Sequence, residues 1–306
     1  MDGFTTQELM AILAMQGFAG VSFFSVLLLM ALGLAIIYGQ MRVINMAHGE
    51  FMVMGAYATY LCSITLGQFP GMTDYYLFLA LPIAFASAFA MGYLVEWVLI
   101  RHLYHRPLDT LLATWGLALI MQQGFRSIFG AREVSVTVPG WLRGSYQPTM
   151  MIDIPLNGIA ILVLTLFVTL GVWWLLFRSR WGLRVRCTTA NREMSGAIGI
   201  NTKRVDRMTF ALGCGIAGIA GAAFTTISST GPTSGSLYIV DTFLVVVFGG
   251  AGSLLGTIAS AFSIAQAQSV MEFFMGGSMA KVLTLLTVIA ILLMRPEGLV
   301  ASKVRR

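Results

Sequence analysis

The first long uncharged stretch, residues 9–41, reads LMAILAMQGFAGVSFFSVLLLMALGLAIIYGQM. It holds 33 residues without a charge between Glu8 and Arg42, whereas a helix needs only about 20 to cross the hydrocarbon core of a bilayer. The whole chain of 306 residues is 57% hydrophobic and only 10% charged, against about 25% charged in ordinary globular domains. These values exclude a soluble enzyme and predict a single polytopic membrane domain over residues 1–306.

Seven more apolar stretches follow the first. Together they predict about eight spans, at roughly residues 18–40, 51–73, 75–95, 110–125, 155–177, 208–230, 242–271 and 277–294. The seventh is interrupted by the run FGGAGS at 248–253, so 238–248 and 254–271 are expected to be two segments of a re-entrant or discontinuous helix. The sixth has glycines at 213, 215, 218 and 221, a spacing that lets helices approach closely. The predicted fold class is an all-α membrane bundle, with an inverted repeat as a further hypothesis.

Basic residues concentrate in one loop. Eight of the 19 Lys and Arg residues fall within 178–207, and such a bias is typical of a cytoplasmic loop. Alternation then predicts that residues 1–8, which carry no Lys or Arg, lie outside. The C-terminal tail, with Arg295, Lys303, Arg305 and Arg306, is expected inside. Three simple crossings after the loop would put the tail outside, so the glycine break is expected to supply the extra turn.

Other features of the composition narrow the protein class. The net charge of the chain is +6. Because so many of the basic residues lie in one loop between membrane spans, this charge does not predict a nucleic-acid partner. The cysteines, Cys62, Cys187 and Cys214, are too far apart for a disulfide framework or a metal site. Residues 1–8 lack the basic region of a signal peptide. Insertion is therefore expected to depend on the spans themselves.

The richest polar cluster joins the first two spans. Asn45, His48 and Glu50 offer amide, imidazole and carboxylate groups within six positions. A broken helix here would present these groups to a polar passage. The equally weighted alternative is a tight cytoplasmic turn whose polar groups cap two helix ends. A zinc site is not predicted, because no second His or Cys stands at ligand spacing.

Two other regions offer groups for a solute path. Gly249 and Gly250 lie in the second break, downstream of Tyr238 and Asp241; close helix packing is the equally weighted alternative for these glycines. Thr114, Trp115 and Gln122 lie in the fourth span. Thr114 and Gln122 are eight apart and therefore near one helix face, although interhelical hydrogen bonding would also explain them.

Within the basic loop, residues 191–199 predict a short helix, with Asn191 as N-cap, Glu193 in the first turn and Gly199 at the end. Arg184, Arg186 and Arg192 accompany it. Such a helix would dock into a partner, or lie on lipid headgroups held by arginine. None of the three lysines sits in a G-x-x-x-x-G-K-[ST] phosphate loop. The chain is therefore not expected to hydrolyse ATP itself.

Taken together, these motifs resemble the permeases of branched-chain amino acid and urea ABC importers. The resemblance runs from about 27 to 299 through the segments 38–39, 44–50, 55–57, 184–199, 248–253 and 295–299. The stretches 111–116 and 238–243 look more like the urea-type permease. Urea is therefore the expected solute, and a branched-chain amino acid is the alternative.

The resemblance implies a transport subunit of the bacterial inner membrane that is not an enzyme. Its implied partners are a second permease, two cytoplasmic ATPases that carry ATP and Mg, and a periplasmic binding protein, with no cofactor on this chain. It implies that residues 191–199 are the counterpart of a coupling helix. It also implies that the Asn45–Glu50 segment and the glycine break are candidate walls of the path. The expected mechanism is alternating access. A passive small-solute channel and an ion-coupled transporter are the rival classes.

Overall fold

The computed structural model describes residues 6–69, 71–104, 106–149, 152–250, 252–295 and 298–300, without the side chains of residues 6–9, 148 and 149. His105, Lys303, Arg305 and Arg306 thus lie outside the described residues, as do residues 1–5. The α-helices of the described part are α1 Thr6–Met41, α2 His48–Gly67, α3 Tyr76–Val98, α4 Pro107–Phe129, α5 Leu156–Arg178, α6 Arg180–Ala190, α7 Arg192–Ala197, α8 Thr202–Phe224, α9 Ser234–Gly249, α10 Leu254–Met275 and α11 Gly277–Met294.

Short elements complete the connections. The 3-10 helix η1 Ile100–His102 lies between α3 and α4. A second one, η2 Gly140–Leu142, lies in the loop between α4 and β1. The antiparallel strands β1 Ser145–Thr149 and β2 Ile152–Pro155 form a hairpin before α5. The sequence did not predict this hairpin, because it lies in a loop without a clear period-two pattern.

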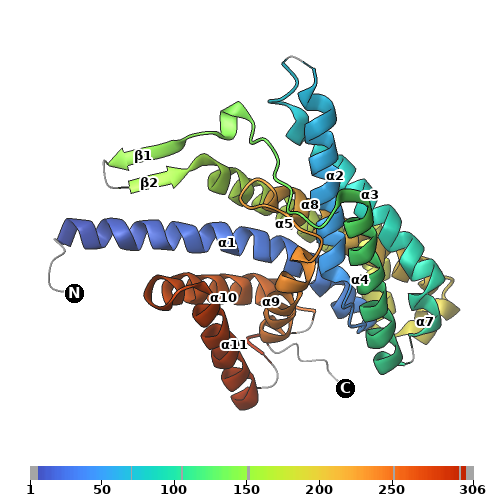
Figure 1. Ribbon diagram of the computed structural model, residues 1–306. Helices are drawn as coiled ribbons and strands as arrows, with labels where there is room; N and C mark the ends of the chain where they lie inside the picture. The colour runs from blue at the N-terminus through green and yellow to red at the C-terminus, as the bar shows by residue number, and fades with distance from the viewer. Residues whose placement is uncertain are drawn as a thin grey trace.

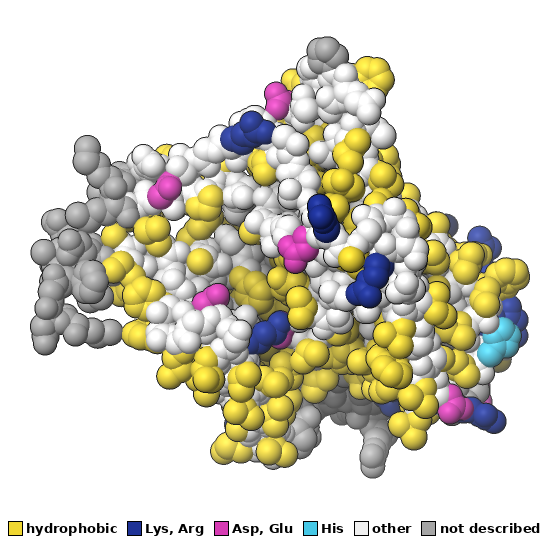
Figure 2. All heavy atoms as spheres, viewed as in Figure 1, with side chains coloured by type: hydrophobic (Ala, Val, Ile, Leu, Met, Phe, Trp, Pro, Cys, Tyr) yellow, Lys and Arg dark blue, Asp and Glu magenta, His cyan; other side chains and the backbone are white. Residues whose placement is uncertain are grey.

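The fold is a polytopic helical membrane bundle, as predicted. Among the described residues, six helices are long and apolar enough to cross a membrane, within Met10–Met41, Tyr76–His102, Leu156–Arg178, Thr202–Phe224, Leu254–Met275 and Gly277–Met294. Hydrophobic side chains dominate much of the face seen in Figure 2, with few charges between them. Such a surface suits a lipid environment, in which only helices and closed barrels satisfy their backbone polar groups.

Helix α8 is the centre of the packing. Its glycines meet neighbouring backbones so closely that a Cβ on Gly213 would lie 2.5 Å from Gly33 O, and one on Gly221 1.9 Å from Met52 O. The predicted close approach on this helix face is therefore confirmed. Helices α1, α5 and α10 run side by side, while α2 crosses their direction steeply (Figure 1). The predicted start of α8 at 208 was too late, because Asn201 Oδ1 accepts a hydrogen bond from Arg204 N (3.0 Å) and begins the helix at Thr202.

The glycine break separates two helices, as the sequence predicts. Helices α9 and α10 fold back on each other: Gly249 packs on Gly256, and Ser260 Oγ donates to Val245 O (2.6 Å). The turn lies against the end of α1, since a Cβ on Gly39 would be 2.8 Å from Gly252 Cα. Leu299 N donates to Phe248 O (2.7 Å), so the described C-terminal residues lie at this end too. The break is thus a turn between two packed helices, as the sequence predicts, while the side of the membrane on which the C-terminal tail lies stays a prediction.

Candidate functional site

The connection between α1 and α2 returns into the bundle. Arg42 has a left-handed backbone (φ +52°) immediately after α1 ends, and the chain turns back there. At the start of α2, His48 Nε2 lies 3.1 Å from Met30 O. Met30 stands 11 residues before the end of α1, which corresponds to about 17 Å along a helix. Helix α2 therefore begins deep beside α1 and not at the end of the bundle.

A central polar cluster forms where α2 begins. We define it as Asn45, His48, Glu50, Thr114 and Gln122. Thr114 Oγ1 accepts from Met46 N (3.1 Å), and Gln122 Nε2 donates to Glu50 Oε1 (2.8 Å). The two α4 residues therefore share the face that meets α2, as their spacing predicted. All members except Gln122 are at most 1% exposed.

The cluster has unused hydrogen-bonding capacity. Asn45 Oδ1 accepts from Ala47 N (3.1 Å), a local turn contact just before α2, whose own N-cap residue, Ala47, has no side-chain capping bond. His48 and Glu50 instead bond to other helices. Within the described part of the chain, Asn45 Nδ2, His48 Nδ1 and Glu50 Oε2 are buried without a hydrogen-bond partner. Such atoms are costly unless something polar pairs with them, so the cluster is suited to receive a small polar guest.

Helix α9 begins against this cluster. A Cβ on Gly49 would lie 2.2 Å from Gly235 O, and one on Gly235 would lie 2.9 Å from Glu50 Oε1. Only glycine permits this contact between the first turns of α2 and α9. Tyr238 and Asp241 follow on α9, and Lys281 Nζ of α11 lies 2.8 Å from Asp241 Oδ2. The structure thus links the predicted residues of α9 to those of α2, and it adds Lys281, which sequence spacing did not connect to Asp241.

Three predicted path residues lie away from the cluster. Gly249 ends α9 and packs closely on Gly256 of α10, and Gly250 follows it in the turn with a left-handed backbone (φ +91°). Trp115 is 54% exposed on the outer face of α4, because consecutive helix residues point in directions about 100° apart. The structure therefore brings neither the break nor Trp115 together with Asn45 and Glu50.

The predicted short helix of the basic loop is α7. Asn191 Oδ1 accepts from Met194 N (2.9 Å) as its N-cap, Glu193 is exposed in the first turn, and Gly199 ends the segment with φ +89°. Arg184 and Arg186 are exposed on α6, where the Arg186 guanidinium lies 5.5 Å from the Phe177 ring centre. The local helix prediction is confirmed.

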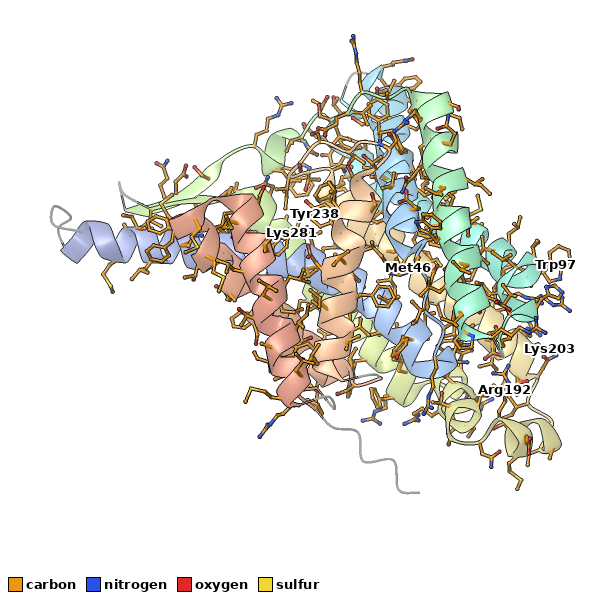
Figure 3. The ribbon with its side chains drawn as sticks, turned by 60° about the horizontal axis from the view of Figure 1, so that its bottom comes forward. Met46, Trp97, Arg192, Lys203, Tyr238 and Lys281 are labelled. Atoms are coloured by element: carbon orange, nitrogen blue, oxygen red, sulfur yellow. The ribbon has the colours of Figure 1, made fainter. Side chains whose placement is uncertain are left out.

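A buried carboxylate ties α7 to the bundle. Asp206 of α8 is fully buried, and its Oδ2 pairs with Arg192. Its Oδ1 accepts a hydrogen bond from Gln40 Nε2 of α1 (3.1 Å). In Figure 3, Arg192 and Lys203 lie at the end of the molecule far from Tyr238 and Lys281. The contact joins the tip of the basic loop to the last turn of α1. Neither Gln40 nor Asp206 was predicted as a site residue, although a carboxylate among basic loop residues was a usable signal.

A second ion pair braces the same end. Arg207 Nε lies 2.9 Å from Glu96 Oε2, and Tyr104 OH donates to Glu96 Oε1 (2.7 Å). The Arg192 guanidinium covers the Tyr104 ring at 5.2 Å. Burial, reinforced by the Asp206 and Glu96 carboxylates, raises the pKa of Tyr104 well above its ordinary value. Tyr104 therefore stays protonated as a donor and connects the two ion pairs.

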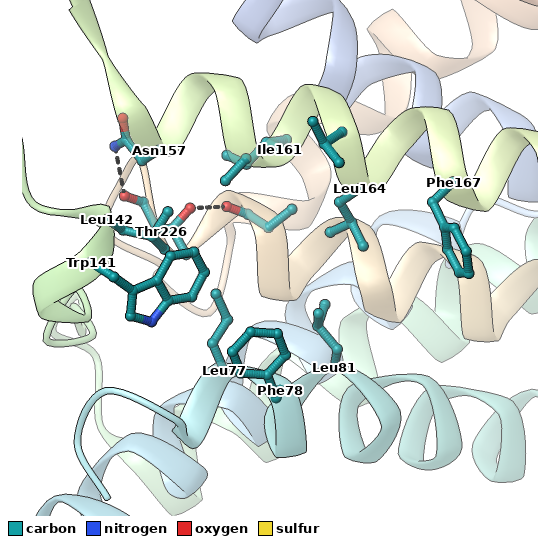
Figure 4. Close-up of a pocket in the computed structure, with 13 residues that line it drawn as sticks. Leu77, Phe78, Leu81, Trp141, Leu142, Asn157, Ile161, Leu164, Phe167 and Thr226 are labelled. Atoms are coloured by element: carbon teal, nitrogen blue, oxygen red, sulfur yellow. Dashed lines mark hydrogen bonds between the residues drawn. The ribbon is translucent and has the colours of Figure 1, made fainter. Parts of the chain in front are cut away.

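An apolar cavity of about 440 Å³ lies apart from these groups. Figure 4 shows it between α3, α5 and the end of α8, with Trp141, Phe78 and Phe167 around it. Its polar edge is internally bonded, since Asn157 Nδ2 donates to Thr226 O (3.2 Å) and Thr226 Oγ1 to Ala223 O (2.7 Å). All predicted site residues lie in the described part of the chain, and they lie outside this lining. The cavity is therefore no candidate for a polar solute.

Comparison with known proteins decides the family. The family described as "Branched-chain amino acid transport system / permease component" matches residues 17–292. The chain belongs to this family of transport permeases. The permease is thus a multi-pass membrane transport component, in agreement with its helices. No group of three His, Cys, Asp or Glu side chains in its described residues is arranged to hold a metal ion.

Three relatives of the permease match over nearly their whole length. The high-affinity branched-chain amino acid transport system permease protein LivH of Salmonella typhimurium is 27% identical, over 93% of this chain and 94% of the relative. LivH of Escherichia coli K12 is 26% identical over the same shares. BraD of Pseudomonas aeruginosa is 27% identical, over 89% of this chain and 90% of its own. No solved structure matches the permease.

Proposed function

We propose that the chain is a permease subunit of an ATP-driven importer that carries branched-chain amino acids across the bacterial inner membrane. The family match over residues 17–292 carries this proposal, and relatives named for branched-chain amino acid transport support the solute class. The proposal takes the alternative of the sequence prediction, because none of the three relatives described above is named for urea. The expected partners are a second permease, two ATPases and a periplasmic binding protein.

The proposed mechanism is alternating access. Helix α7 docks on the ATPases and moves with them when they close. Arg192 and Asp206 pass this motion to Gln40 in the last turn of α1. Since the chain returns from α1 to the central polar cluster, a shift of α1 changes the exposure of Asn45, His48 and Glu50. The glycine turn, with Gly249 and Gly250, is proposed to flank the cytoplasmic exit.

A passive channel and an ion-coupled transporter are the rival functions. A channel leaves α7 and its buried tie to α1 without a role. An ion-coupled transporter would need a relay of ionisable groups through the bundle. The buried ionisable groups of the described centre, His48 and Glu50, each bond to a neutral partner, a carbonyl and an amide. The proposed importer instead gives a role both to α7 with its tie to α1 and to the central polar cluster.

The test is uptake of labelled leucine and labelled urea by cells that lack and then regain this chain, with the partner subunits present. Restored leucine uptake that depends on the ATPases is expected. Restored urea uptake without leucine would return the solute to the sequence prediction. Leucine uptake that persists after removal of the ATPases would contradict the importer and favour a channel.

A further inference from the structure

A second polar site lies in the half of the bundle away from the basic loop. A cavity of about 540 Å³ opens between α1, α9, α10 and α11. Its charged lining residues are Asp241, Glu272 and Lys281, and its apolar ones are Ala19, Phe23 and Phe273. Volumes of about 300–1,000 Å³ are usual for small-molecule sites. Basic, acidic and apolar groups thus share one cavity of suitable size.

Lys281 is positioned by its surroundings and retains a donor. Its ammonium lies 2.8 Å from Asp241 Oδ2, donates to Leu237 O (2.8 Å), and lies 5.4 Å from the Tyr238 ring centre. Its side chain is 37% exposed, whereas that of Asp241 is 7% exposed. An ammonium has three N–H donors, and these contacts occupy at most two of them. One donor is therefore available to an acceptor in the cavity.

Glu272 supplies the opposite charge without a partner. It lines the cavity and is exposed. Among the described residues, no Lys, Arg or His nitrogen lies within 4.0 Å of its carboxylate. Two carboxylates and one ammonium give the empty cavity a formal charge of −1. A ligand that brings an ammonium group would therefore be favoured over an anion.

We propose that this cavity binds an aliphatic α-amino acid as its zwitterion. Lys281 holds the carboxylate, Glu272 with Asp241 holds the ammonium, and the side chain packs against Phe23 and Phe273. The inference rests on the proposed function and names the site that meets the solute first. A neutral amide such as urea would leave the charge on Glu272 uncompensated.

The placement of the cavity suits an entry site. Gln16 near the start of α1, Glu272 at the end of α10 and Lys281 in α11 all contribute to it. Tyr238 and Lys281 lie beside each other, and Met46 of the returning connection lies nearer the centre of the molecule (Figure 3). Helix α9 carries Asp241 and begins at Gly235, against Glu50. One helix thus connects the cavity with the central polar cluster.

The first arm of the test measures site occupancy in the full transporter complex in lipid nanodiscs. Gln268→Cys, combined with Cys187→Ser, places a thiol in the cavity lining. A small methanethiosulfonate reagent is then applied with leucine, 4-methylpentanoate or 3-methylbutylamine. Leucine is expected to slow labelling roughly tenfold at about ten times its dissociation constant, while the two analogues, each lacking one charge, protect far less. Gln147→Cys on β1, outside the cavity, is the matched control and should label equally with and without leucine.

The second arm measures leucine uptake. Lys281→Met is expected to abolish leucine protection and to lower uptake about tenfold, a change of 1.4 kcal/mol, while Lys281→Arg retains both. Equal protection by 4-methylpentanoate, or no protection by leucine in a complex that imports leucine, would overturn the site. A complex that imports no leucine at all would contradict the proposed function instead, so the two failures are distinguishable.

Discussion

The side chain of Asn45 closes the turn that carries the chain back into the bundle. Its Oδ1 accepts from Ala47 N at the start of α2, while its buried Nδ2 has no partner in the described structure. One side chain thus orders the turn before α2 and retains a buried donor without a partner. The proposed path therefore depends on a few fully buried polar atoms. Loss of a hydrogen-bond partner of any one of them is costly in the low-dielectric interior.

Asn45→Ala tests this dual role. Loss of the turn contact should lower stability by about 1 kcal/mol, the usual net contribution of one hydrogen bond, and the displaced start of α2 should abolish most leucine uptake. The complex should still assemble, because Asn45 is fully buried in the bundle, whereas Glu193 on the docking helix α7 is exposed. Initial uptake rate and yield of purified complex are the measurements. Asn157→Ala, which removes an equivalent amide contact at the start of α5, is the control; normal uptake kinetics in Asn45→Ala would remove Asn45 from the path.

Glycines determine how closely the helices approach. Along α8 they put the backbone of one helix against that of the next, and at Gly49 and Gly235 they bring two helix starts together. Packing of this kind is the main source of helix association in lipid, where burial of apolar surface contributes little. Helix α2, which carries His48 and Glu50 of the central polar cluster, is therefore positioned by close backbone contacts with α8 and with α9.

Gly221→Ala should destabilise the bundle by about 1–3 kcal/mol, the usual cost of overpacking, because its Cβ would lie 1.9 Å from Met52 O. Thermal unfolding in detergent measures the effect. Gly124→Ala on α4 is the matched control, since nothing lies within 4 Å of its Cβ position. That variant should be neutral or more stable by up to about 1 kcal/mol, from helix propensity. Equal melting temperatures for the two variants would contradict the packing argument.

Helix α7 is the element proposed to contact the ATPases. Glu193 is exposed in its first turn, where a negative charge complements the helix dipole. Glu193→Lys should weaken ATPase docking about tenfold, equal to 1.4 kcal/mol, without changing insertion. The measurement is the yield of ATPase that copurifies with the permease. Asp153→Lys at the opposite end of the molecule is the charge-matched control, and an unchanged yield in Glu193→Lys would argue against the docking role.

The whole molecule has two chemically different ends. One carries the basic loop, the Asp206 and Glu96 ion pairs, the glycine turn and residues 298–300. The other carries the β-hairpin and the amino-acid cavity. From the arginine bias of the basic loop we propose that the end carrying this loop is cytoplasmic. The N-terminal end of α1 and the cavity would then face the periplasm.

Cys187, the partly exposed cysteine of the basic loop, reports this orientation. A membrane-impermeant maleimide should label it in inside-out vesicles and not in right-side-out vesicles. Cys62 and Cys214 are buried and should react only after denaturation. Gln147→Cys should show the reverse pattern from the other end. Labelling of Cys187 in right-side-out vesicles would invert the proposed topology.

The membrane class, most of the helices and the helix of the basic loop could be predicted from the sequence alone. These depend on uncharged length, charge bias and capping residues, which are local properties of the chain. Asn45, His48 and Glu50 were also recognisable, because polar groups between two apolar stretches need a reason. The buried face of α8 could also be predicted, because glycines at this spacing allow neighbouring helices to approach closely.

Which of these residues contact one another could not be predicted from the sequence. The pairs Asp241 with Lys281, and Arg192 and Gln40 with Asp206, join residues 14 to 166 positions apart, and no periodicity predicts such contacts. The sequence showed no evident site for an amino acid, because that cavity is assembled from four helices. It also could not separate Trp115 from Thr114, since the position of α2 decides which side of α4 faces the central polar cluster. Contacts between distant segments depend on how helices cross, and in lipid that is decided by close packing rather than by local pattern.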